Sequence, residues 1–225
     1  MTADQPGKKL RILVVADTCV SETGLTTIVA RSQRYSVCAS AHGFFDAEEL
    51  VRRHQPDVLL IEPFLGDRDG ILWIRELARQ HPETRILIAT RRCEQIYAER
   101  ALQAGAAGYW MENGHCEELL RAIDTVADGD IYASPAITAL AMQRFARRTN
   151  APGGVSALSD RELAVFSLIA AGRRPGEIAS ELGISRKTIE THCEHIKQKL
   201  GYANAEELKA GARTLLGPPN VARAA

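Results

Sequence analysis

Four polar residues in the first half of the chain each follow directly after an apolar run: Asp17, Glu62, Thr90 and Glu112. If these runs are parallel strands, their carboxyl ends meet at one edge of a sheet, where sites in such sheets lie. Carboxylates that converge there raise one another's pKa or bind a divalent cation. Alternatively, they point to water or accept hydrogen bonds from Thr90 and nearby amides.

A second set of polar residues lies in one run near the C-terminus. Ile189, Ile196 and Leu200 are spaced by seven and four residues, which predicts a helix with this side turned inward. The residues predicted to face outward are Arg186, Lys187, Thr188, Glu190, Thr191, His192, Glu194, His195, Lys197 and Lys199. Such a helix suits the major groove of DNA, which admits one helix and offers hydrogen-bonding base edges.

The segments before this helix predict a helix-turn-helix. Ser159 and Glu162 have capping-box spacing, and an apolar helical face follows until Gly172. A short helix is predicted from Pro175, a sharp bend at Gly183, and a further helix capped by Ser185. A last helix at 205–215 carries Leu208, Ala212 and Leu215, which we expect to be exposed or half-buried and to form a dimer contact.

The first half alternates between strand and helix patterns. Apolar runs predict strands at 10–16, 36–41, 57–61, 85–90 and 107–111. Helices are predicted at 25–30, after a cap at Asp46, and at 71–80, 94–104 and 116–129. Five units of this length predict an α/β domain with a five-stranded, doubly wound parallel sheet. The all-α module of four helices follows it.

Residues 9–129 resemble the receiver domain of two-component response regulators, which is flavodoxin-like. The resemblance is carried by PDVLLIEPFLGDRDG, with Asp69 and Gly70 in register, by ILIAT and by AGAAGYWMEN. It implies that Thr90 is the switch threonine and Tyr109 the switch aromatic residue.

The same resemblance implies a pocket where an aspartate accepts phosphoryl, two acidic residues help to hold Mg²⁺, and a lysine pairs with the phosphoryl group. Here Glu62 stands at the aspartate position, Ala16 and Asp17 at the acidic pair, and Glu112 at the lysine position. A glutamate displaces its carboxylate by about 1.5 Å, one C–C bond, and in-line transfer is sensitive to such shifts. The missing carboxylate weakens a magnesium site, and Glu112 repels an incoming phosphoryl group. We therefore expect a degenerate receiver that is not phosphorylated, with no cofactor or metal.

Three hypotheses for the altered pocket stay open. Glu62 and Glu112 point to water or bond to Thr90 and nearby amides, Glu62 imitates a phosphorylated side chain, or Asp17, Glu62 and Glu112 together bind a cation. The imitation is incomplete because no cation stands at position 112.

Residues 156–217 resemble the DNA-binding domain of NarL/FixJ (LuxR-type) regulators, most clearly in EIASELGISRKTIETHCEHIKQKLG. The resemblance implies that Lys187, Thr188 and His192 touch phosphates or the groove edge. Lys197 and Lys199 either reach backbone phosphates or keep the helix soluble.

Glu190, Thr191 and Glu194 lie where related proteins present side chains to base edges. Two of these three are acidic, which departs from the expected pattern. A glutamate accepts a hydrogen bond from cytosine N4 but is repelled by phosphates. A further departure is Arg174, which replaces a small polar cap before Pro175.

Charge adds little to this interpretation. Residues 156–225 hold ten Lys and Arg against eight Asp and Glu, and residues 1–155 hold eighteen against twenty. A net charge of +2 is weak for a DNA-binding domain, so the basic residues must be well placed or dimerisation must double them.

Other classes of protein find no support in the sequence. The chain lacks a long apolar stretch and a signal core, so we expect a soluble, cytoplasmic protein without a membrane partner. The five cysteines show neither a disulfide framework nor zinc-site spacing. The absence of GxGxxG, P-loop and nucleophile-elbow motifs argues against an enzyme.

The sequence thus predicts a receiver-like domain at 9–129, a linker with a helix at 130–155 and a helix-turn-helix domain at 156–217. The expected function is transcription regulation by a homodimer on double-stranded DNA, independent of phosphorylation. Another regulator and RNA polymerase are further possible partners. The alternative is an adaptor that docks another regulator through its receiver and has little DNA affinity of its own.

Overall fold

The computed structural model describes residues 9–63, 70–112, 115–147 and 154–216. The chain divides into two compact units at Arg147 and Arg148. Asp69 of the receiver motif and residues 148–153 of the predicted linker lie outside the described residues. Each unit is described by itself.

A parallel sheet forms the centre of the first unit, and within the described residues it has the five predicted strands. These are β1 (Leu10–Val15), β2 (Tyr35–Ala41), β3 (Val58–Ile61), β4 (Arg85–Thr90) and β5 (Gly108–Met111). Their order, β2-β1-β3-β4-β5, confirms the doubly wound topology. All four residues of β3 are buried, as expected for a strand covered on both faces.

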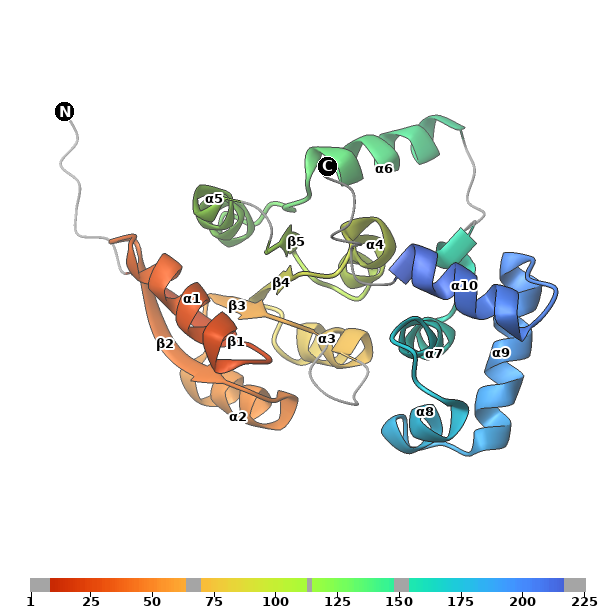
Figure 1. The fold of residues 1–225 in the computed structure, drawn as a ribbon. Helices are drawn as coiled ribbons and strands as arrows, with labels where there is room; N and C mark the ends of the chain where they lie inside the picture. Colours follow the sequence, from red (N-terminus) through yellow and green to blue (C-terminus); the bar gives the residue numbers. More distant parts are fainter. Residues whose placement is uncertain (1–8, 64–69, 113–114, 148–153, 217–225) are drawn as a thin grey trace, which may run out of the picture. The chain divides into compact units, whose positions relative to one another are not determined.

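Helices cover both faces of this sheet (Figure 1). The core of one face joins strand residues to Leu25 and Val29 of α1 (Cys19–Ala30) and to Leu119 and Ile123 of α5 (Cys116–Ala127). On the other face, α2 (Phe44–His54) contacts α3 (Gly70–Gln80), which contacts α4 (Glu94–Gln103). The strand ends that carry the polar residues are thereby fixed in one rigid layer.

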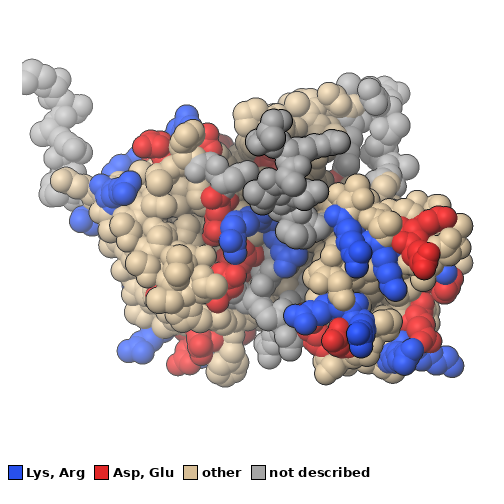
Figure 2. All heavy atoms as spheres, in the orientation of Figure 1, with Lys and Arg blue, Asp and Glu red and all other residues tan. Residues whose placement is uncertain are grey.

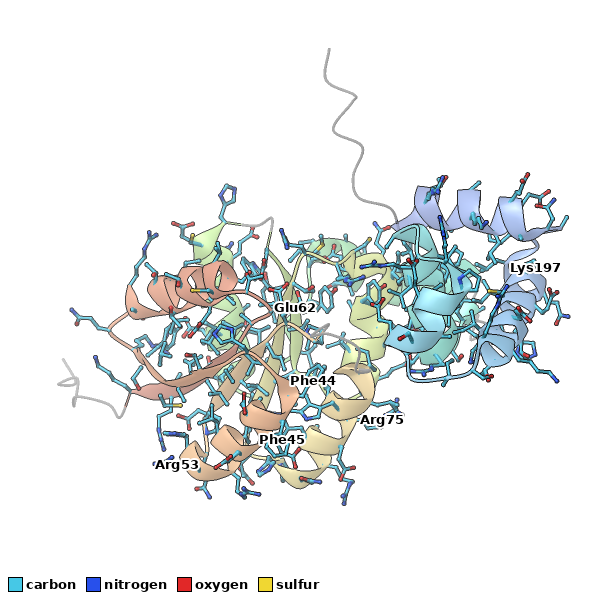
Figure 3. The ribbon with its side chains drawn as sticks, turned by 60° about the horizontal axis from the view of Figure 1, so that its bottom comes forward. Phe44, Phe45, Arg53, Glu62, Arg75 and Lys197 are labelled. Carbon is cyan, nitrogen blue, oxygen red and sulfur yellow. The ribbon has the colours of Figure 1, made fainter. Side chains whose placement is uncertain are left out.

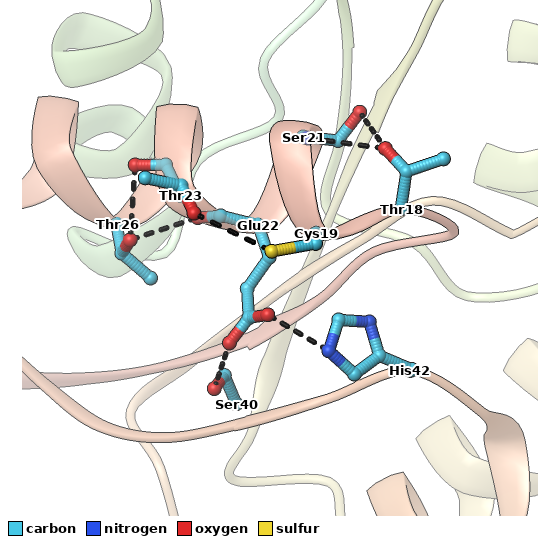
Figure 4. Close-up of polar contacts among 8 residues, drawn as sticks. All are labelled: Thr18, Cys19, Ser21, Glu22, Thr23, Thr26, Ser40 and His42. Carbon is cyan, nitrogen blue, oxygen red and sulfur yellow. Dashed lines mark hydrogen bonds and ion pairs between the residues drawn. The ribbon is translucent and has the colours of Figure 1, made fainter.

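Polar contacts fix the start of α1 (Figure 4). Thr18 Oγ1 accepts a hydrogen bond from the Ser21 amide, so α1 begins well before the predicted apolar stretch. Glu22 accepts a hydrogen bond from Ser40 and lies 2.8 Å from His42 Nε2. These contacts tie α1 to the end of β2, beside the loop that holds Asp17.

The predicted cap at Asp46 is wrong. Helix α2 begins at Phe44 after Gly43, which makes no side-chain cap, and Asp46 lies in the first turn. The earlier start buries the Phe44 ring, whose centroid lies 4.9 Å from that of Trp73. Asp46 still favours the helix, because negative charge is stabilised near a helix N-terminus.

The segment predicted as a linker is largely part of the first unit. Tyr132 exchanges backbone hydrogen bonds with the edge of β5, donating to Ala107 O and accepting from the Tyr109 amide. Helix α6 (Pro135–Arg147) contacts α4, and Ser134 Oγ donates to Glu94 Oε1 at 2.8 Å. Tyr132 therefore covers the edge of β5, and α6 packs against α4.

The second unit contains a short 3₁₀ helix, η1 (Gly154–Ala157), followed by α7 (Asp160–Ala170), α8 (Pro175–Glu181), α9 (Arg186–Leu200) and α10 (Ala205–Leu216). The capping box of Ser159 and Glu162 is present. Ser185 caps α9. Gly183 has a positive φ of 62°, which the sharp bend between α8 and α9 requires. The predicted four-helix module is confirmed within the described residues.

The predicted exposure of three apolar residues on α10 is wrong for two of them, and the dimer contact stays a prediction. Leu208 and Ala212 are buried within their own unit, because α10 packs against α7 and α9. Leu215 is exposed. The apolar stripe of α10 is thus used for the fold of the unit.

Two glycines of the first unit give a matched test of this packing. A Cβ at Gly108 would lie 2.9 Å from Tyr132 Cβ, whereas a Cβ at Gly24 would meet no atom within 4 Å. We expect Gly108→Ala to lower the free energy of unfolding by about 1–3 kcal/mol, the usual cost of overpacking. Gly24→Ala, in the helix α1, should raise it by about 0.5–1 kcal/mol. Both tryptophans, Trp73 and Trp110, belong to this unit, so denaturation followed by their fluorescence measures the effect.

Candidate functional site

The polar residues at the strand ends lie where the sequence places them. Glu62 follows β3 and is buried, and its amide donates to Val15 O at 2.9 Å. The Glu112 amide donates to Thr90 O at 2.9 Å. Figure 3 shows Glu62 at this end of the sheet. The fold therefore brings the predicted pocket residues to one edge.

Glu112 is a largely buried acid at this edge whose pKa is raised. Its side chain is 17 % exposed, and its carboxylate lies 3.9 Å from Nε of the exposed Arg91. Burial raises its pKa, the charge of Arg91 opposes the rise, and the nearby charge of Asp17 adds to it. The pocket thus holds two mutually repelling carboxylates at Asp17 and Glu112.

Thr90 and Tyr109 are both held against the loop after β4. Thr90 is fully buried, and its Oγ1 accepts a hydrogen bond from the Arg92 amide at 3.2 Å. Tyr109 is 1 % exposed, and its hydroxyl donates to Arg92 O at 2.9 Å. Burial and the nearby charge of Glu62 raise the pKa of Tyr109, which keeps the phenol protonated.

The hypothesis of a cation site is not supported by this geometry. Among the described residues, no three His, Cys, Asp or Glu side chains are placed so that they could hold a metal ion together. The charge of Asp17 acts on Glu112, and the charge of Glu62 acts on Tyr109.

In the second unit, the outer face of α9 is exposed, but its charges are mostly paired. Arg186 Nε lies 3.3 Å from Glu190 Oε1, and Lys197 Nζ lies 2.8 Å from Glu194 Oε1. Lys197 lies on α9 in Figure 3. Both acids predicted to face base edges are thus neutralised within the helix. Among the described residues, no acidic partner is found for Lys187.

Glu162 is a functional residue whose full role the sequence did not reveal. Its side chain is only 5 % exposed, and one oxygen accepts hydrogen bonds from Lys199 Nζ at 2.6 Å and from the Ser159 amide at 2.7 Å. The other oxygen lies 3.7 Å from His195 Nδ1. Glu162 therefore caps α7 and also anchors α9, so Lys199, expected at phosphates, holds the two helices together in this structure.

His192 is half-buried rather than fully outward-facing. Burial lowers its pKa, a shift that the charge of Glu162 opposes. Its Nδ1 is buried and has no hydrogen-bond partner among the described residues. The neutral ring is a weaker phosphate ligand than a cation, and the phosphate contact of His192 stays a prediction.

Comparison with known proteins agrees with this architecture. Residues 12–124 match the response regulator receiver domain, and residues 156–210 match the bacterial regulatory proteins of the luxR family. The oxygen regulatory protein NreC of Staphylococcus carnosus is 34 % identical over 207 residues, which cover 88 % of this chain and 94 % of that protein. This chain is a NarL/FixJ-type response regulator.

Solved structures show the same fold. RcsB from Salmonella enterica bound to promoter rprA superposes with a TM-score of 0.69 at 19 % identity, covering 92 % of this chain and 99 % of RcsB. A LuxR-family response regulator from Aurantimonas sp. covers 61 % of this chain and 99 % of its own, with 29 % identity and a TM-score of 0.57. The family is one of DNA-binding transcription regulators, which are not typical enzymes. No helix in the described part of this response regulator is long and apolar enough to cross a membrane.

The role of Glu162 in this response regulator can be tested by Glu162→Gln. Burial alone would raise the pKa of Glu162, but the bonds from Lys199 and Ser159 outweigh it and the pKa is lowered. Losing the charge should cost the second unit about 1.5–3 kcal/mol at neutral pH, the range for hydrogen bonds to charged groups. A carboxyl group whose pKa is lower in the folded state stabilises that state at any pH above its unfolded-state pKa. The difference in unfolding free energy between wild type and Glu162→Gln should therefore vanish as the pH falls through the folded-state pKa.

Thermal and urea unfolding of the full chain, followed by circular dichroism, measure this loss. Glu76→Gln is the matched control, because Glu76 also pairs with a cation, Arg79, but on an exposed helix face. An equal loss for both variants would contradict the anchoring role of Glu162.

Proposed function

We propose that this response regulator controls transcription as a DNA-bound homodimer and that its receiver is not switched by phosphorylation. The observation that carries the proposal is Glu112, an acid where the receiver pattern implies a cation. Its raised pKa reflects burial beside Asp17, so the pocket already resists additional negative charge.

The acceptor position supports the same conclusion. The Glu62 carboxylate is one methylene farther from its backbone than that of an aspartate, and β3 fixes that backbone through the bond to Val15 O. Ala16, at the end of β1, is fully buried and offers no ligand to magnesium. Arg91 is the cation near Glu112, but it is exposed, and a partner of that kind contributes little.

The position of Tyr109 indicates how an unphosphorylated receiver keeps one conformation. The buried ring and its bond to Arg92 O hold the loop after β4 without any phosphoryl group. Glu62 lies near enough for its charge to affect the phenol. We infer that this arrangement is the resting state of the receiver and that it is compatible with DNA binding.

For DNA reading, α9 supplies exposed side chains on a helix anchored to α7. The ion pairs of Glu190 and Glu194 with cations of the same helix reduce the repulsion that two acids would impose on phosphates. We assign Lys187 the main phosphate contact of α9, because its ammonium group is not engaged by a described acid. Thr191 is exposed and remains our candidate for base contacts.

The small net positive charge of one DNA-binding unit supports our proposal of a dimer. A second copy doubles the cationic contacts and suits a two-fold site, in which recognition helices lie about 34 Å apart. The buried stripe of α10 leaves Leu215 as its exposed apolar residue. Cross-linking of the full chain in solution locates the interface.

Phosphorylation is tested with acetyl phosphate and Mg²⁺. We expect no phosphoryl group on the wild type by intact mass, because Glu62 is displaced and Glu112 repels the donor. Glu62→Asp alone should gain little. The triple variant Ala16→Asp, Glu62→Asp, Glu112→Lys restores the four groups and should become labelled. A labelled wild type would refute the proposal.

DNA binding is tested by selection from random duplexes with protein free of phosphodonors. Enrichment of a two-fold symmetric site and an affinity that falls steeply with salt are expected. Lys187→Ala should weaken binding to all sequences and reduce the salt slope by about 1, whereas Thr191→Ala should change base preference. No enrichment would favour the adaptor alternative, and an equal, sequence-independent loss for both variants would remove the assigned roles.

A further inference from the structure

The second unit contains a cavity of about 460 Å³ that DNA reading does not explain. It is lined by residues at the end of α7 and the start of α8, by one side of α9 and by α10. Its size lies within the range of small-molecule sites, about 300–1,000 Å³. All of its lining residues belong to one unit, so the cavity is a property of this unit alone.

The inner part of the cavity is apolar. Ile178 and Ile189 are fully buried and Leu208 is 2 % exposed, and these three form what we term the apolar floor. Cys193 also lines the cavity. Burial raises the pKa of its thiol, which therefore stays uncharged at neutral pH. The floor suits the apolar body of a ligand.

The mouth of the cavity carries positive charge. Arg174, Lys209 and Arg213 line it and are exposed, and we term them the cationic rim. Among the described residues, none of the three forms an ion pair with an acidic side chain. Figure 2 shows Lys and Arg side chains over α10 and over the segment between α7 and α8.

The remaining charges of the lining are already compensated. Lys197 pairs with Glu194, and Glu190 pairs with Arg186. Arg173 Nε lies 3.9 Å from Glu181. The cationic rim is therefore the part of the cavity with charge available for a ligand.

We propose that this cavity binds a small amphiphilic carboxylate, with its apolar body on the apolar floor and its anionic group against the cationic rim. An apolar floor with few polar groups at its margin is the usual composition of a small-molecule site. A free inorganic anion would leave the floor uncovered, and a neutral lipid would leave the rim unpaired.

The thiol inside the cavity allows a direct test on the full chain. Decanoate is the probe, and alkylation of each cysteine by N-ethylmaleimide is followed by peptide mass spectrometry. We expect decanoate to slow alkylation of Cys193 but not of the exposed Cys19 and Cys93. The double variant Lys209→Ala, Arg213→Ala should need about tenfold more decanoate for half-protection, because charge-assisted contacts are lost. Arg79→Ala, which removes an exposed arginine of the first unit outside the cavity, should behave as wild type. Neutral decanol should protect less than decanoate.

Several outcomes would overturn the proposal. Decanoate that leaves Cys193 alkylation unchanged, or slows all three thiols alike, means that the cavity is not its site. Equal protection of wild type and double variant removes the role of the cationic rim. Protection by duplex DNA alone assigns the rim to phosphates, and protection that grows with protein concentration assigns the cavity to a second copy. Protection by decanoate does not require DNA binding, so this proposal and the proposed function fail separately.

Discussion

A carboxylate withdrawn from water needs compensating partners, and this requirement shapes both units. Glu162 meets it fully, because an amide, an ammonium group and an imidazole surround its two oxygens, and its pKa is lowered. Glu112 meets it poorly, with one exposed guanidinium at 3.9 Å and a second acid nearby, and its pKa is raised. The first carboxylate holds helices together, and the second is the basis of our proposal that the pocket is unsuited to a further anion.

Because carboxylates need compensating partners, most cations of α9 form ion pairs with acids of their own unit. Three of the four cations of α9 are committed to acids, Arg186 and Lys197 within the helix and Lys199 to Glu162. Anchoring α9 to α7 thus uses the charge of Lys199, one of the two lysines for which a phosphate contact was one expectation. A domain with so small an excess of positive charge can bind DNA despite these internal ion pairs only if each remaining cation is well placed or if two copies act together.

Sequence reasoning predicted the parts of this fold that depend on local pattern. Apolar runs gave the strands, and the spacing of Ser159 and Glu162 gave the capping box, because both signals lie within a few residues of each other. It failed at Asp46, where burial of Phe44 against Trp73 overrides the preferred cap. It also failed at Leu208 and Ala212, since an amphipathic helix does not say whether its own unit or a partner covers its stripe.

The candidate sites were predictable to the same degree. Parallel strands must end at one edge, so Glu62, Thr90 and Glu112 could be grouped from their positions alone. The partner of Lys199 could not be foreseen, because Glu162 is 37 residues away in the chain and the contact exists only once α9 packs on α7. The contact of Tyr132 with the edge of β5 could not be predicted either, because its backbone makes the contact and no side-chain pattern indicates it.

The cavity and the reading face of α9 share residues, which constrains both. Glu190 and Glu194 line the cavity, and they are also the acids expected near base edges. Their ion pairs with Arg186 and Lys197 fix them on the helix surface. An anion at the cationic rim and a DNA base at α9 would therefore both interact with these two ion pairs. If the proposed ligand drew Lys197 toward the cavity, the Glu194 carboxylate would be freed to face DNA, which would increase repulsion from phosphates but strengthen its capacity to accept a bond from cytosine. In that case, occupancy of the cavity and base preference would be coupled through these two ion pairs.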